Sequence, residues 1–85
     1  MSTESNKSAI EQHVIDYVTA LRHKNDLRQE DIAIIIGVTR SFINNVESGV
    51  KGAKYNLNHI DKLADHFGLS PKDFLPEKAT SYIKK

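Results

Sequence analysis

The chain of 85 residues contains no cysteine, which excludes disulfide bonds and zinc sites built on thiolates. It has no apolar run that approaches the ~18–20 residues of a membrane-spanning helix. Its first residues, MSTESNKS, lack the apolar segment of a signal peptide. These absences lead us to expect a soluble, cytoplasmic protein without a membrane partner.

Charge of one sign is also lacking, because twelve Lys and Arg side chains nearly balance eleven Asp and Glu side chains, for a formal net charge of +1. This balance is only a weak indication of a nucleic-acid partner. The distribution of charge is more informative. The basic residues of the middle segment are Arg28, Arg40, Lys51 and Lys54, and the acidic residues that follow them are Asp61, Asp65, Asp73 and Glu77. We expect one modestly basic face, with a low and salt-sensitive affinity for non-specific DNA.

Catalytic motifs are missing as well. The sequence shows no Ser/His/Asp pattern, no glycine-rich phosphate loop and no paired catalytic carboxylates. Of the four histidines, His59 and His66 are spaced to share one helix face, but no acid at the matching turn completes a metal site. We therefore expect neither an enzyme nor a protein that holds a metal ion or another cofactor.

The length fits one small domain, which buries roughly 60–65% of its unfolded surface. Residues 1–7 are polar and without periodicity, and we expect them to be disordered. Residues 8–75 are expected to form the domain, and residues 76–85 a tail too short to fold alone. A capping-box pattern at Ser8 and Glu11 opens the first helix.

Hydrophobic spacing and end signals predict five short helices and an all-α fold. Asn25 or Asp26 is expected to end the first helix, because either residue tolerates a left-handed conformation. The expected core positions are Ile10, Val14, Tyr17, Val18 and Leu21 in that helix, and Leu57, Ile60, Leu63, Ala64 and Phe67 in the helix over residues 57–67. The pattern Ser70-Pro71-x-Asp73 predicts a fifth helix, which brings Phe74 and Leu75 to the core.

Residues 29–48 carry the most informative spacing, because it indicates two short helices joined by a glycine turn. The apolar positions in register are Ile32, Ile36, Val38, Ile43 and Val46. Ala33 lies where the two helices would cross closely, and Gly37 follows the first helix where a positive φ is common. Thr39 is a good N-cap for the second helix. This arrangement is typical of a helix-turn-helix, whose second helix enters the major groove of DNA.

The chain resembles the lambda-repressor-like helix-turn-helix family, to which the phage Cro and repressor proteins belong. The matching elements are Arg22, LRQEDIA (27–33), Gly37-Val38, ESG (47–49), KLADHFGLS (62–70) and PKDFL (71–75). The resemblance covers roughly residues 10–75. It implies a compact five-helix domain, with the helix-turn-helix at the second and third helices, that binds double-stranded DNA. It also implies a homodimer, with its contact around residues 67–83.

The helix expected over residues 40–48 carries the candidates for reading DNA bases. Because Ile43 and Val46 point inward, the opposite face presents Arg40, Ser41, Asn44 and Asn45. Arg can donate two hydrogen bonds to guanine, Asn can pair with adenine, and Ser is a weaker partner for either. The resemblance assigns base reading to Arg40, Ser41 and Asn45. The alternative is an ordinary solvated helix face.

Phosphate contacts are expected from Gln29, Arg28, Lys51 and Lys54. The resemblance gives Gln29 this role, at a helix N-terminus that suits an anion. Arg28 stands where the family prefers a Ser or Thr cap, and contact with a phosphate is one rationale for it. For Gln29 and the two loop lysines, ordinary surface positions remain the alternative. The resemblance further implies that Arg22 and Glu47 form a partly buried, structural ion pair.

Three residues depart from the family pattern. Phe42 either contacts a thymine methyl group or folds back over Ile35 at the edge of the core. Ile34 and Ile35 extend an apolar run on a helix that normally has one face exposed to water. This patch is covered by the tail residues Tyr82 and Ile83, by a partner chain, or by Ile15 and Phe42.

Three functions follow as hypotheses. The first is a repressor-like transcriptional regulator that reads a near-palindrome as a dimer. The second is the DNA-binding member of a pair, such as an antitoxin, whose apolar patch holds a partner protein. The third is a helix-turn-helix that has lost DNA binding and serves only as a protein-interaction module.

Overall fold

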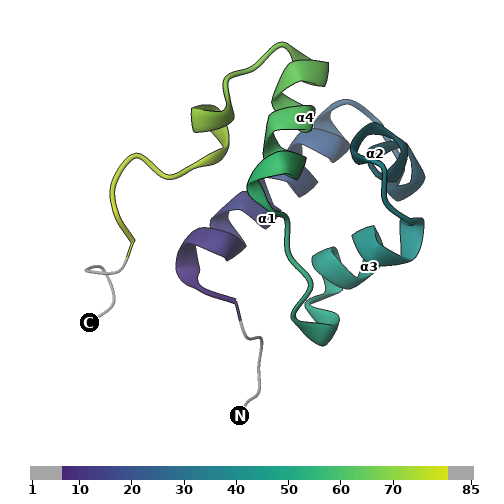
Figure 1. The fold of residues 1–85 in the computed structure, drawn as a ribbon, viewed down its shortest axis with the longest axis horizontal. Helices are drawn as coiled ribbons and strands as arrows, with labels where there is room; N and C mark the ends of the chain where they lie inside the picture. The colour runs from purple at the N-terminus through teal and green to yellow at the C-terminus, as the bar shows by residue number, and fades with distance from the viewer. Residues whose placement is uncertain (1–6, 81–85) are drawn as a thin grey trace.

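The computed structural model describes residues 7–80, apart from the side chain of Lys51, and the described residues form helices and no strand. The α-helices are α1 (Ala9–Lys24), α2 (Gln29–Ile36), α3 (Arg40–Ser48) and α4 (Leu57–Phe67). Two short 3-10 helices, η1 (Val50–Gly52) and η2 (Pro71–Phe74), follow α3 and α4. Figure 1 shows α2 and α3 on one side of the molecule and the segment after η2 on the opposite side. The predicted all-α class is confirmed.

The predicted count of five α-helices is corrected, because the described residues contain four. The segment expected to be the fifth is η2, a 3-10 helix of four residues. Its start is capped as predicted, since the Ser70 hydroxyl accepts from the Lys72 N–H at 3.4 Å and Asp73 accepts from the Ser70 N–H at 2.9 Å. Its end is fixed by Pro76, which disfavours helical geometry at the preceding Leu75. Leu75 is accordingly extended, with φ −107° and ψ 154°, and too few residues remain for an α-helix.

The ends of α1 follow the predicted signals. Glu11 and Ser8 form the reciprocal capping box, in which the Ser8 N–H donates to the Glu11 carboxylate at 2.9 Å. The helix ends at Asn25, and Asp26 then adopts φ 57°. Lys7 departs from the expected disorder of residues 1–7, because its ammonium donates to the carbonyl of Val46 at 3.0 Å. The rest of that segment, 1–6, lies outside the described residues.

The turn between α2 and α3 has the geometry that the sequence predicts. Gly37 takes φ 76°, and its N–H donates to the carbonyl of Ala33 at 2.8 Å. The N–H of Val38 donates to the same carbonyl at 2.9 Å. The Thr39 hydroxyl then accepts from the N–H of Phe42 at 3.1 Å and starts α3. These contacts fix the direction in which α3 leaves the turn.

The core lies where α1, α2, α3 and α4 meet, and η2 closes it from one side. Its buried apolar residues are Val14, Ile15, Val18, Ile32, Ala33, Ile36, Ile43, Val46, Tyr55, Ile60, Leu63, Ala64 and Phe74. Phe74 is completely buried, and its ring lies 4.8 Å from that of Tyr17 between ring centroids. η2 is therefore held to α1 mainly by one aromatic side chain.

Three expected core positions are wrong. Leu57 is 77% exposed, Ile10 is 41% exposed and Leu75 is 38% exposed. Leu57 and Ile10 each lie in the first turn of their helix, on the same face as the buried residues that follow. Both helices extend one turn beyond the core, so the apolar face continues where no other element of the described chain covers it.

Candidate nucleic-acid interface

The outer face of α3 carries the four predicted base-reading residues. Ile43 and Val46 are completely buried, which fixes the rotation of the helix about its axis. On the other side, Arg40, Ser41 and Asn44 are exposed and Asn45 is half-buried. The predicted polar residues therefore lie on one face of α3. Whether this face reads DNA stays a prediction.

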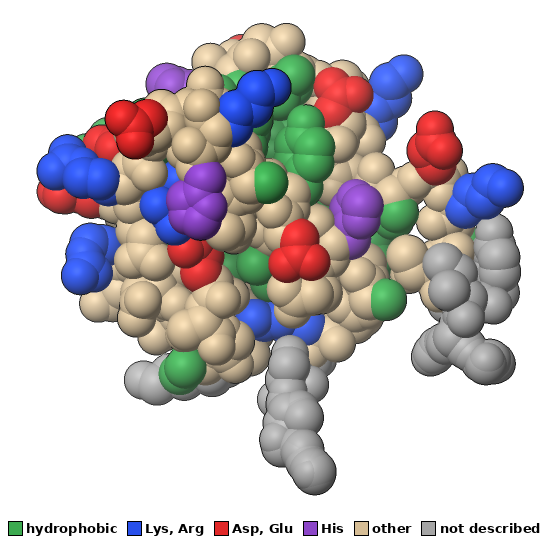
Figure 2. Space-filling view, turned by 180° about the vertical axis from the view of Figure 1, so that it is seen from behind, with side chains coloured by type: hydrophobic (Ala, Val, Ile, Leu, Met, Phe, Trp, Pro, Cys, Tyr) green, Lys and Arg blue, Asp and Glu red, His purple; other side chains and the backbone are tan. Residues whose placement is uncertain are grey.

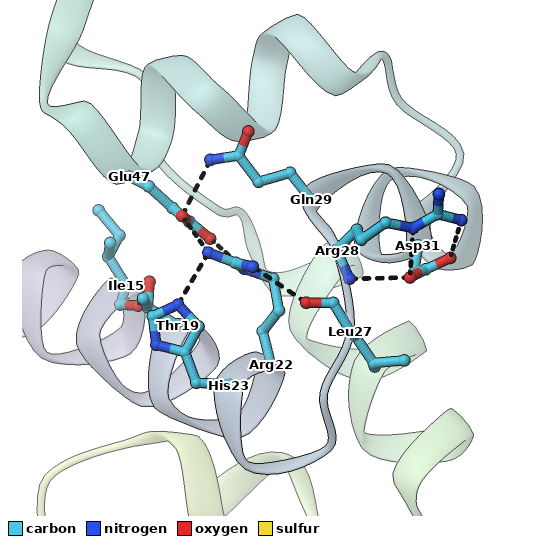
Figure 3. Close-up of polar contacts among 9 residues, drawn as sticks. All are labelled: Ile15, Thr19, Arg22, His23, Leu27, Arg28, Gln29, Asp31 and Glu47. Atoms are coloured by element: carbon cyan, nitrogen blue, oxygen red, sulfur yellow. Dashed lines mark hydrogen bonds and ion pairs between the residues drawn. The ribbon is translucent and has the colours of Figure 1, made fainter.

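An ion pair ties α3 to α1. The Arg22 guanidinium donates through Nε and Nη2 to the two carboxylate oxygens of Glu47, both at 2.8 Å (Figure 3). A third hydrogen bond runs from Arg22 Nη1 to the carbonyl of Leu27 at 3.0 Å. The two side chains are only 13% and 12% exposed. The ion pair that the family resemblance implied is present, and it also fixes the segment that leads into α2.

Gln29, the first residue of α2, completes this network. Its amide nitrogen donates to Glu47 Oε1 at 3.0 Å, so one carboxylate joins α1, α2 and α3 (Figure 3). Burial of Glu47 raises the pKa of its carboxyl, but the hydrogen bonds from Arg22 and Gln29 outweigh this and hold the pKa below its ordinary value. Glu47 is thus ionised at neutral pH. The Gln29 amide carries a second hydrogen that this contact does not use.

Arg28 lies back over its own helix. Its side chain has no acceptor atom, so it cannot cap α2 as a Ser or Thr would. Asp31 supplies the other half of the cap by accepting from the Arg28 N–H at 2.8 Å, and the guanidinium approaches the same carboxylate at 3.5 Å (Figure 3). This backbone hydrogen bond, followed by the side-chain contact, lowers the pKa of Asp31. The Arg28 side chain is 76% exposed, so leaving Asp31 for a phosphate would cost little.

A polar groove brings several predicted residues together. It has a volume of about 360 Å³ and lies where the start of α2 meets the start of α3. Its lining residues are Arg22, Leu27, Arg28, Gln29, Glu30 and Arg40. Three arginines and one glutamine thus line the same hollow together with one glutamate. Within the described chain, the Arg22 guanidinium is paired with Glu47 and that of Arg28 approaches Asp31. Such a set can bind a phosphate through charge-assisted hydrogen bonds.

The loop lysines are placed less clearly. Lys54 forms an ion pair with Glu11 at 3.1 Å, which directs its ammonium toward α1. The side chain of Lys51 lies outside what the structure describes. Contact of either lysine with a phosphate remains a prediction. On the face seen in Figure 2, acidic and basic side chains are mixed, with apolar side chains between them.

Phe42 packs at the edge of the core, which was one of the two alternatives that the sequence left open. Its ring centroid lies 5.6 Å from that of His59 and 6.4 Å from that of Tyr55. The sequence suggested neither aromatic neighbour, because both lie more than ten residues further along the chain. Tyr55 is buried, its hydroxyl oxygen has no hydrogen-bond partner within the described chain, and burial raises its pKa.

The core covers part of the apolar patch on α2, which consists of Ile34 and Ile35. Ile35 is half-buried and packs against it, whereas Ile34 is 72% exposed. Ile34 and Ile35 line a shallow hollow together with Leu27, Asp31 and His66. The tail residues proposed as a cover, Tyr82 and Ile83, lie outside the described residues.

His59 is a second residue that sequence reasoning missed. Its ring nitrogen Nδ1 accepts from the N–H of Asn56 at 3.1 Å, while the Asn56 side chain accepts from the His59 N–H at 2.8 Å. Asn56 is thus the N-cap of α4, and His59 supplies the acceptor that Glu or Gln usually gives. The sequence indicates this reciprocal cap, because an Asn is followed three residues later by a side chain that has an acceptor atom.

Protonation of His59 is expected to weaken the start of α4. Partial burial first, and then the nearby Lys62, lower its pKa below the ordinary value. The folded state therefore favours the neutral ring, so this contribution to stability is complete above about pH 6.5 and is lost as pH falls below that value. Urea unfolding between pH 5 and 8 measures it. His59→Gln should flatten the pH dependence, whereas the same change at exposed His13 should leave it unchanged. An identical pH profile in the His59 variant would contradict this assignment.

A comparison with known families agrees with this geometry. The model of the lambda-repressor-like helix-turn-helix family matches residues 18–74, which include α2, α3, α4 and η2. The chain therefore belongs to this family. A comparison with curated proteins and a comparison with solved structures found no match to this chain.

Two further observations bear on the kind of partner. None of the helices in the described part of the chain combines the length and the apolar character needed to cross a membrane. Within residues 7–80, His, Asp and Glu side chains form no group of three or more that could hold a metal ion. The family is one of DNA-binding regulators, so double-stranded DNA is the partner class that its membership indicates.

Proposed function

We propose that this protein is a sequence-specific transcriptional regulator of the repressor type, which reads the major groove with α3 as a two-fold dimer on a near-palindromic site. One observation carries the proposal. The polar face of α3 borders the groove at the start of α2, which Arg22, Arg28 and Arg40 line. Arg40 belongs to both the polar face and the groove. Groups suited to bases and groups suited to phosphates thus form one continuous surface.

The roles follow from side-chain chemistry. Arg40 donates two hydrogen bonds to a guanine edge, Asn44 and Asn45 pair with adenine, and Ser41 contacts either base. Gln29 and Arg28 bind the phosphate beside the start of α2, where the helix N-terminus favours an anion. Arg22 and Glu47 do not read bases. They hold α3 at a fixed angle to α2, so that these contacts can form together.

A dimer is needed because one domain of this size covers too few base pairs for selective binding. Single small modules bury about 600–1,000 Å² on DNA, and specific binding usually involves more. Two copies with recognition helices about 34 Å apart would read successive major grooves on one side of the duplex. Their operator would then be a near-palindrome.

Selection of sites from a random duplex library tests the proposal. We expect wild type to enrich a near-palindromic sequence and Arg40→Ala/Asn45→Ala to lose that preference. Arg40→Ala alone should cost about 1–3 kcal/mol of binding free energy on the best site and relax one position. Asn58→Ala, an exposed change on α4, is the matched control. Unchanged sequence preference in the double variant, with a normal circular dichroism spectrum, would refute the assignment.

Exposed Ile34 supports a second candidate, in which the protein is the DNA-binding member of a pair and α2 holds a partner protein. A third reading, an interaction module without DNA binding, predicts no enrichment in the selection at low salt. Salt separates these readings, because several phosphate contacts make affinity fall steeply as salt rises. The guanidinium groove favours DNA binding over the third reading.

A further inference from the structure

The apolar side chains left exposed at the helix starts line one groove. It has a volume of about 400 Å³ and lies between the first turn of α1, the first turn of α4 and the segment after η2. Val14 and Ile60 form its buried floor, and the exposed residues Ile10, Leu57 and Leu75 stand around them. The groove is lined mainly by apolar surface, unlike the groove at the start of α2. Apart from Lys54, its lining residues have no part in the contacts with DNA that we expect.

We propose that a second copy of this chain docks on this groove about a two-fold axis. The inference rests on the proposed function, which needs a dimer but does not say where its interface lies. Leu57 and Leu75 become buried against their counterparts in the partner, which removes the largest exposed apolar side chain of the described residues from water. In a two-fold interface the same patch must complement itself.

The charges at the rim meet this condition. Glu11 and Lys54 line the groove from opposite elements and form an ion pair within one chain at 3.1 Å. A rim with one acid and one base is complementary to its own copy after a two-fold rotation, because each acid can face the partner's base. A rim of one sign would repel its copy instead.

The position of the groove suits an assembly on DNA. Lys54 and Leu57 belong to the connection and helix start that follow α3, so the two copies would meet beside α3 and leave its polar face uncovered.

Within its described part, residues 67–80, the region expected from the resemblance exposes one large apolar side chain. Phe67 and Leu69 are half-buried and pack against the core of their own chain. Leu75 is the exposed apolar residue of this region within the described chain, and it already lines the groove. The proposal therefore assigns the interface to the start of α4 and not to its end. Such a small surface gives a weak dimer, which DNA stabilises by binding both copies.

Leu57→Glu and Ile34→Glu form a matched pair of variants. Both replace a side chain more than two-thirds exposed, so neither should disturb folding, and they lie on different faces, at the start of α4 and on α2. In sedimentation equilibrium without DNA, from about 10 μM to 1 mM protein, we expect wild type and Ile34→Glu to associate alike. Leu57→Glu should weaken association at least about tenfold, because it buries a charge in an apolar contact.

A charge exchange tests contact between the copies directly. Lys54→Glu and Glu11→Lys should each weaken association, and an equimolar mixture of the two should restore it, because each rim then faces an opposite charge. A purely intramolecular pair gives no restoration on mixing. A monomer at every concentration, including one whose groove holds Tyr82 or Ile83 of its own chain, overturns the proposal. So does association that Ile34→Glu weakens and Leu57→Glu does not.

DNA then separates this proposal from the proposed function. If both hold, Leu57→Glu should bind a single half-site like wild type and lose the extra affinity for the two-fold site. If Leu57→Glu keeps the extra affinity for the two-fold site, the dimer interface lies elsewhere and the DNA-binding function is kept. Association that depends on Leu57, without binding of any DNA by wild type, would keep the interface and refute the function.

Discussion

Glu47→Ala is expected to lower the free energy of unfolding by about 3 kcal/mol, since removing one partner of a buried ion pair leaves the other charge uncompensated. The Arg22 guanidinium would keep its contacts with the Leu27 carbonyl and the His23 ring nitrogen but lose its link to α3, and the Gln29 amide would lose its acceptor. The value lies at the low end for buried pairs because both side chains retain 12–13% exposure. Urea unfolding at pH 7 measures the change.

The matched variants make this prediction specific. Glu47→Gln keeps the shape and one acceptor oxygen, so it should cost less than Glu47→Ala. Asp65→Ala, an exposed acid on α4, should stay within about 0.5 kcal/mol of wild type. If Glu47→Ala behaves like Asp65→Ala, the network of Arg22, Gln29 and Glu47 contributes little to stability, and its role in fixing α3 is wrong.

The dependence of this effect on pH has a definite sign. The folded-state pKa of Glu47 lies below its ordinary value, so the ion pair contributes fully above that ordinary value, about pH 4.3. The contribution is lost as pH falls through the lower, folded-state pKa. Wild type and Glu47→Gln should therefore converge in stability under acid. Parallel curves down to pH 2 would show that Glu47 is not the group responsible.

Local signals predicted the helix-turn-helix from the sequence. Gly37 and Thr39 mark the turn because a positive φ and an N-cap each depend on a few neighbouring residues, and both are present as predicted. The end of α1 at Asn25 and the cap of α4 at Asn56 follow for the same reason. Periodicity likewise gave most of the buried residues in the middle of each helix, but it missed Ile15 of α1, which is 2% exposed.

The failures concern how far the core extends. Periodicity placed Leu57 on the correct face of α4, but it cannot show that the helix begins one turn beyond its neighbours. Similarly, the sequence left open whether Phe42 packs on the core or contacts DNA, and it did not reveal that Tyr55 and His59 lie against its ring. Both depend on contacts between distant segments.

The candidate site was likewise predicted from the sequence only in part. Residue types and helical spacing put Arg40, Ser41 and Asn44 on one face of α3. The groove that joins Arg28 and Gln29 to Arg40 comes from the angle between α2 and α3, which only the fold supplies. The link from Gln29 to Glu47 was not foreseen for the same reason. Spacing thus predicted which residues could bind, and the packing of the helices determines which of them can act together.

Phe74→Ala is expected to cost about 3–5 kcal/mol of unfolding free energy, the range for truncating a fully buried aromatic side chain. Phe74 is completely buried, and its ring packs on Tyr17 at 4.8 Å. Because η2 has only four residues, it cannot be stable without this contact. A small domain with a stability near 5 kcal/mol would then retain only about 0–2 kcal/mol and be marginally stable. Thermal and urea unfolding measure the loss.

Leu75→Ala is the matched control for Phe74→Ala, because it removes a neighbouring apolar side chain that is 38% exposed. We expect it to cost well under half as much stability, since much less apolar surface is returned to water. The two variants also separate folding from assembly. Leu75→Ala should weaken association of the copies while the chain remains folded, and Phe74→Ala should affect both. Equal losses of stability in the two variants would mean that η2 is held by the edge of the groove rather than by the core.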